Sequence, residues 1–125
     1  MTEAIYPNES FKIVAYLFEV FNELGYGYQK KYYYRAIKNR LVAKGFIVEE
    51  QLYTPLVSDG KRIGGYYLDF RLNGTIVLEI KVANAIYPQH IKQAHGYLKA
   101  HNLQLGIIGV FTKNGIIHKR VVNLY

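Results

Sequence analysis

The first third of the chain carries apolar residues at helical spacing. From residue 10 onward they follow steps of three and four, which predicts an amphipathic helix with Ser10 as its N-cap. Its apolar positions are Ile13, Val14, Leu17, Phe18, Phe21 and Leu24. Residues 1–9 are expected to form an irregular arm. A Gly-Tyr-Gly run at 25–27 ends this helix, and a second helix is expected from Tyr28 to Lys44, with Gly45 at the C′ position.

After Gly45 the pattern becomes that of strands. It predicts strands at 46–57, 63–72, 75–82, 105–111 and 116–122, and a helix from 88 to about 101. Pro55 places the first strand at an edge or a bend, and Asn73-Gly74 forms a hairpin turn. The element order predicts a single α/β domain over residues 1–125. We expect an α/β/α sandwich around one mixed sheet of about five strands.

The composition narrows the class of protein. The 125 residues include no cysteine, which excludes zinc ribbons, iron–sulfur clusters and thiol catalysis and fits a reducing compartment. The longest stretch without a charged side chain, residues 100–112, is too short and too polar to cross a bilayer. The N-terminus lacks the basic-then-apolar order of a signal peptide. We expect a soluble cytoplasmic domain with no membrane partner.

The positive charge is concentrated in one segment. The net charge is +7, and six basic residues without an acid lie between Tyr28 and Lys44. Such a segment indicates a polyanionic partner, most commonly nucleic acid, with Lys31, Arg35 and Lys38 as candidate substrate-binding residues. A solvated helix face is the alternative.

One expected strand combines a buried pattern with charge. Residues 76–82 are nearly all apolar, yet they include Glu79 and Lys81. Strand alternation puts Val77, Glu79 and Lys81 on one face. Buried charges are costly unless they are paired or bind metal, so the choice is between a Glu79–Lys81 salt bridge and a metal site.

Asp69, on the preceding strand, can join Glu79 only if the turn between the two strands allows it. A two-residue loop puts the two acids on opposite faces, whereas a three-residue loop or a bulge puts them on one face. Two converging carboxylates beside a lysine suit Mg²⁺ or Mn²⁺. Lys81 would then hold the attacking water or stabilise phosphate charge.

Asp69 followed by Glu79-Ile80-Lys81 resembles the D…ExK signature of the PD-(D/E)XK nuclease superfamily. Further segments resemble the GxxExxY family within it, in the same order. They are Leu24-Gly25-Tyr26-Gly27 with Tyr33, Gly64 to Asp69, Ile76 to Lys81, Gln93 with Tyr97-Leu98-Lys99-Ala100, Leu105-Gly106-Ile107-Ile108 with Phe111, and Lys119-Arg120-Val121-Val122-Asn123. The resemblance covers about residues 10–124. It implies a restriction-endonuclease-like core of αβββαβ order with an extra N-terminal helix.

The resemblance also implies roles for single residues. Asp69 and Glu79 would hold Mg²⁺ or Mn²⁺, and Lys81 would be the catalytic lysine in the hydrolysis of DNA. Gln93 and Tyr97 resemble the Q-x-x-x-Y element of the exonuclease branch, in which Gln93 would assist catalysis and Tyr97 would contact substrate. A helix face packed on the sheet is the alternative for both.

One position departs from the family pattern. The motif Gly-x-x-Glu-x-x-Tyr matches residues 27–33, and Lys30 stands in place of the glutamate. Helical spacing puts Lys30 on an apolar, inward face. Its ammonium either pairs with Asp69 and Glu79 in the place of the cation, or extends outward to phosphate. Glu23 is a candidate replacement for the missing acid.

Three interpretations stay open at this point. The first is a metal-dependent deoxyribonuclease, and the second is a nucleic-acid-binding protein whose catalysis is weakened or lost through Lys30. The third is an interaction module whose basic helix binds an acidic protein. The oligomeric state, a homodimer included, is open, as are the strand form of the substrate, its sequence preference, and the choice between endo- and exonuclease.

Overall fold

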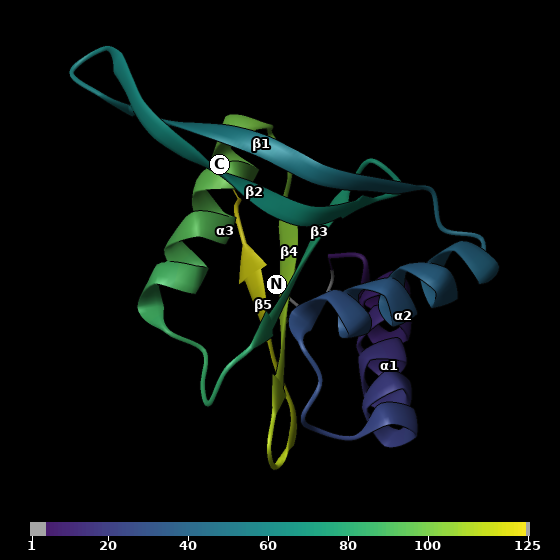
Figure 1. The fold of residues 1–125 in the computed structure, drawn as a ribbon. Helices are drawn as coiled ribbons and strands as arrows, with labels where there is room; N and C mark the ends of the chain where they lie inside the picture. The colour runs from purple at the N-terminus through teal and green to yellow at the C-terminus, as the bar shows by residue number, and fades with distance from the viewer. Residues whose placement is uncertain (1–4, 125) are drawn as a thin grey trace.

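The computed structural model describes residues 5–124 and has the expected order of elements (Figure 1). The helices are α1 (Pro7–Leu24), α2 (Lys30–Ala43) and α3 (Pro88–Ala100). The strands are β1 (Val48–Ser58), β2 (Lys61–Leu72), β3 (Ile76–Val82), β4 (Leu105–Thr112) and β5 (Gly115–Val122). They form one sheet in the order β1-β2-β3-β4-β5, with β3 and β4 parallel and the other neighbours antiparallel. The mixed sheet with helices confirms the predicted fold class.

The first helix begins earlier than the apolar pattern predicted. Pro7 lies in its first turn, where the missing N–H of proline costs no hydrogen bond. The Ser10 N–H already donates to the Tyr6 carbonyl oxygen at 2.9 Å. Ser10 is therefore a buried residue of α1 and not its N-cap, and residues 7–9 are helical, not an irregular arm. Residues 1–4 of the expected arm lie outside the described part.

The sheet separates two hydrophobic cores. Leu78 and Ile80 of β3 lie in the core covered by α1 and α2, whereas Val77 lies in the core under α3. Each such aliphatic side chain contributes roughly 1.5–3 kcal/mol through burial. Because side chains alternate along a strand, Glu79 and Lys81 belong to the α3 side. Within residues 5–124, no helix is long and apolar enough to cross a membrane.

The connection between β2 and β3 fixes the relation of the two acids. Leu72 pairs with Ile76 and Phe70 with Leu78, so the loop comprises the three residues 73–75. Asn73 and Gly74 both have positive φ, 53° and 68°, and the Thr75 N–H donates to the Leu72 carbonyl oxygen at 3.0 Å. Continued by one residue, this register brings position 69 opposite position 79. The three-residue alternative is thus the one adopted.

The β1–β2 hairpin extends well beyond the rest of the sheet (Figure 1). Ten residue pairs join β1 and β2, but β2 pairs with β3 only over residues 70–72. Residues 61–68 of β2 therefore have β1 as their ladder partner, and β1 is an edge strand, which accommodates Pro55 as expected.

Candidate active site

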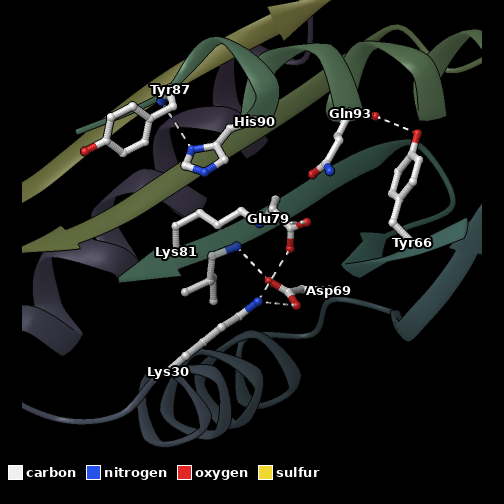
Figure 2. Close-up of polar contacts among 9 residues, drawn as sticks. Lys30, Tyr66, Asp69, Glu79, Lys81, Tyr87, His90 and Gln93 are labelled. Carbon is white, nitrogen blue, oxygen red and sulfur yellow. Dashed lines mark hydrogen bonds and ion pairs between the residues drawn. The ribbon is translucent and has the colours of Figure 1, made fainter. Parts of the chain in front are cut away.

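Asp69 and Glu79 meet where the ladder between β2 and β3 ends. Beyond the last pair, Phe70 and Leu78, the Ile80 N–H donates to Asp69 Oδ2 at 2.7 Å (Figure 2). The Asp69 carboxylate thus takes the place of a main-chain carbonyl as the hydrogen-bond acceptor, and this bond fixes the orientation of the Asp69 side chain. Asp69 is 3% and Glu79 4% exposed, so the chain buries two adjacent acids at the end of a broken ladder.

Two ammonium groups face this carboxylate pair. Lys30 Nζ of α2 lies 3.0 Å from Asp69 Oδ1 and 3.8 Å from Glu79 Oε1, and Lys81 Nζ lies 3.9 Å from Glu79 Oε2. Figure 2 shows Lys30 reaching the pair from the helix and Lys81 running along the strand. The inward orientation predicted for Lys30 is therefore the one observed. It contacts both acids.

Burial raises the pKa of Glu79 far above its ordinary value, and the hydrogen bond and the charge of Asp69 raise it further. The charges of Lys81 and Lys30 act in the opposite direction but are smaller causes. Two carboxylates this close do not both ionise readily in a poorly solvated site. Without a bound cation, the pair therefore keeps a proton at pH values at which solvent-exposed carboxyl groups are ionised.

The donor set suits a hard divalent cation. Carboxylate oxygens are the ligands that Mg²⁺ and Mn²⁺ prefer, and Mg²⁺ is commonly bound through one or two carboxylates while it keeps several waters. Glu79 Oε1 is buried and makes no hydrogen bond, so it has a free lone pair for a cation. Within residues 5–124, no cluster of three or more His, Asp or Glu adds a further ligand. Lys30 Nζ currently supplies the positive charge near both acids.

A sequence model of the PD-(D/E)XK nuclease superfamily matches residues 7–121. This chain belongs to that superfamily. The match spans α1 through most of β5 and includes Asp69, Glu79 and Lys81. A comparison with curated proteins found no match.

Two solved structures share the superfamily fold. SSO0001 is 18% identical with a TM-score of 0.54, over 97% of this chain and 62% of its own. The alkaline exonuclease LHK-Exo from Laribacter hongkongensis is 19% identical with a TM-score of 0.50, over 74% of this chain and 54% of its own. The chain thus spans less than two thirds of either protein, and the likeness concerns the fold.

The two α3 residues expected at this nuclease-type site lie in different environments. The Gln93 side chain points from α3 toward Glu79, while its main-chain carbonyl oxygen accepts the Tyr66 hydroxyl at 3.1 Å (Figure 2). Tyr97 has no exposed surface, its ring stacks on His101 at 4.1 Å, and its hydroxyl accepts a bond from Arg71. Tyr97 therefore packs α3 on the sheet, with no surface left for a substrate.

A basic groove of about 550 Å³ leads to the acids from the α2 side. Its walls include Lys31, Arg35 and Lys38 on α2 and Tyr67 on β2, and it reaches Lys30 and Asp69. The three residues expected to bind substrate thus lie together. Lys38 Nζ is also paired with Glu50 at 2.7 Å. Asp69 is the acid that lines the groove, whereas Glu79 and Lys81 are not part of its wall.

Glu23 does not replace the missing helix acid. Its side chain is 60% exposed, and its carboxylate lies 3.7 Å from Arg40. Arg40 also contacts Glu19 at 3.3 Å. These contacts join α1 to α2 on the surface and leave Lys30 as the α2 residue at the acid pair.

His90 is a site neighbour that the sequence patterns did not single out. Its Nδ1 accepts the Tyr87 N–H at 3.3 Å at the start of α3 (Figure 2). Partial burial, and then the charge of Lys81, lower the pKa of His90, so this imidazole stays neutral over a wider pH range than usual. The signal in the sequence was Pro88, which places His90 in the first turn of the helix facing β3.

Proposed function

We propose that this chain is a divalent-metal-dependent nuclease that hydrolyses phosphodiester bonds in DNA. The observation that carries the proposal is the convergence of Asp69, Glu79 and Lys81 at the end of the β2–β3 ladder. Membership of the nuclease superfamily supports it, and the basic groove beside Asp69 supplies a path for a polyanion. The order of the motifs along the chain supports assignment to the GxxExxY family.

Each residue then has a chemical task. Asp69, oriented by the Ile80 N–H, and Glu79, with its free oxygen, would hold Mg²⁺ or Mn²⁺. The cation would polarise the phosphodiester and lower the pKa of a bound water. Lys81 places an ammonium beside the pair, where it would donate to a phosphate oxygen or hold the water. The Gln93 amide, aimed at Glu79, is suited to position the carboxylate or the water.

The test is cleavage of plasmid DNA with Mg²⁺ or Mn²⁺ and with EDTA. We expect cleavage that requires the metal and is lost in Glu79→Ala, because removing one of two metal-binding carboxylates removes most of the site. Glu9→Ala, the same change of charge in the first turn of α1, is the matched control and should cleave as the original chain does. Equal cleavage by Glu79→Ala would contradict the proposed function.

The Lys30 ion pairs favour a second candidate, a nucleic-acid-binding protein that does not cleave. If the ammonium remains 3.0 Å from Asp69 Oδ1 when a divalent cation is offered, repulsion between the two cations keeps the metal out. In that case DNA binds in the groove without cleavage at any metal concentration, and Lys30→Glu restores metal binding. The 41% exposure of the Lys30 side chain leaves room for it to swing out, which favours the first candidate.

A further inference from the structure

The outer part of the β1–β2 hairpin carries a row of aromatic and cationic side chains that contact one another outside the two hydrophobic cores. Tyr53 and Tyr67 are direct cross-strand partners, with ring centroids 5.0 Å apart. Tyr67 is 59% exposed. The Arg62 guanidinium lies over the Tyr53 ring, 4.9 Å from its centroid. We call Tyr67, Tyr53 and Arg62 the aromatic strip. Because cross-strand partners share a face, it lies along one face of the hairpin.

Gly65 allows this strip to form. A Cβ at Gly65 would lie 2.1 Å from the Tyr53 hydroxyl oxygen, so the tyrosine ring lies over the bare glycine backbone. The hydroxyl donates to the Gly64 carbonyl oxygen at 3.2 Å, which holds the ring in place. At Gly64, by contrast, an added Cβ would have no atom within 4 Å. The two adjacent glycines therefore differ sharply in what a side chain would disturb.

The strip is continuous with the basic groove, because Tyr67 belongs to both. Tyr67 lines the groove together with Lys31 and Arg35 of α2, and the groove ends at Asp69. A path of aromatic and cationic side chains thus runs from the hairpin to the acid pair. Among residues 5–124, neither Lys31 nor Arg35 has a carboxylate within ion-pair distance, so both are available for phosphate.

We propose that this path binds single-stranded nucleic acid, with a base stacked on the exposed Tyr67 ring, which Tyr53 supports from the side, and the backbone along Lys31 and Arg35. An aromatic ring can stack on a base only when that base is not stacked between neighbours in a duplex. The positive groove matches a phosphate backbone. The proposal deepens the proposed function by naming the strand form, and it rests on that function only for the statement that the bound strand is the one cut.

The test measures binding without cleavage. Fluorescence anisotropy in EDTA compares a labelled oligothymidine with a blunt duplex of equal length, for the original chain and for Tyr67→Ala. We expect the single strand to bind more tightly, and Tyr67→Ala to weaken it about tenfold while changing duplex binding little. Tyr26→Ala, which removes a comparably exposed tyrosine outside the path, should bind as the original chain does. Equal losses for both DNA forms, or no loss at all, overturn the proposal.

A second pair of variants keeps every contacting group and moves only the ring. Gly65→Ala displaces the Tyr53 side chain, whereas Gly64→Ala leaves it in place. We expect weaker single-strand binding in Gly65→Ala alone, with thermal unfolding showing that both variants are folded at the assay temperature. Equal affinities in these folded variants overturn the role of the strip.

Cleavage assays separate this proposal from the proposed function. Preferential single-strand binding without metal-dependent cleavage would leave the path intact and reject the nuclease. Metal-dependent cleavage of single strands that is unchanged in Tyr67→Ala would support the nuclease and reject the proposed path. If the groove instead binds an acidic protein, oligothymidine should bind weakly and Tyr67→Ala should not change its affinity. This outcome also rejects the proposal.

Discussion

At the residue scale, burial of the acid pair Asp69 and Glu79 lowers the stability of the fold by an amount that depends on pH. Glu79 is 4% exposed, and its pKa is raised from an ordinary value of 4.5 by burial and by Asp69. The folded chain therefore binds a proton that the unfolded chain releases above its usual pKa. The associated stability is present at low pH and is lost as the pH rises from about 4.5 toward the raised pKa.

Glu79→Gln should remove this loss, because the neutral amide resembles the protonated acid. Without metal, we expect the variant to exceed the original chain in unfolding free energy by roughly 1–3 kcal/mol at pH 8, and by little at pH 5. Urea unfolding in EDTA at the two pH values measures the difference. A gap that does not grow with pH would show that Glu79 ionises in the fold as it does in water.

At the element scale, α2 divides its positive charge between structure and binding. Lys30, Lys38 and Arg40 contact acids, and Lys44 caps the far end of the helix. Lys31 and Arg35 lie in the groove, and each makes a cation–π contact with the exposed Tyr32 ring, at 5.2 and 5.9 Å from its centroid. The six basic residues of the segment therefore do not all face one polyanion.

The salt dependence of DNA binding should reflect only the basic side chains that lie in the groove, and not all six of the segment. With two or three phosphates contacted, log K against log salt should have a slope of about −1.4 to −2.1 for a single strand. Lys31→Ala should reduce this slope by about 0.7, whereas Lys44→Ala should leave it unchanged. Anisotropy titrations between about 50 and 200 mM salt measure it. A slope that Lys44→Ala reduces as much as Lys31→Ala does would place the DNA along the whole helix.

The elements were largely predictable because their patterns are local. The helix and strand periods lead to all eight elements, and helical spacing puts Lys30 on the inward face of its helix, although its contact with the acids stayed one of two alternatives. The start of α1 was not predictable from apolar spacing, because Pro7 begins the helix before the first apolar residue facing the core. The three-residue loop at 73–75 was open in the sequence, since both loop lengths suit Asn-Gly and only the register of the sheet decides between them.

At the scale of the whole molecule, long-range placement was beyond the sequence. The register of the β1–β2 hairpin brings Tyr53 and Gly65 together. The period-two pattern of the sequence does not show that the Tyr53 ring lies over the Gly65 backbone. Likewise, Tyr97 sits at a helix position typical of either a substrate contact or a core contact, and the bond from Arg71 selects the core. The sheet order, in contrast, follows from three hairpins and one crossover.

The arrangement of the whole molecule brings α2, β2 and β3 together at the acid pair, where Lys30 and the proposed divalent metal would exclude each other. At about 5 Å and an effective dielectric near 20, a +1/+2 pair repels by roughly 6–7 kcal/mol. Even a small part of this energy changes metal affinity tenfold or more. Lys30→Glu should therefore bind metal more tightly than the original chain, whereas Lys44→Glu, with the same change of charge at the other end of α2, should not.

Calorimetric titration with Mn²⁺ tests the central claim, that Asp69 and Glu79 hold a divalent cation. The predicted result is one site in the original chain, at least about tenfold tighter binding in Lys30→Glu, no change in Lys44→Glu and no binding in Glu79→Ala. Binding by Glu79→Ala that equals the original chain would contradict it, whereas equal affinities for Lys30→Glu and the original chain would contradict the exclusion of metal by Lys30.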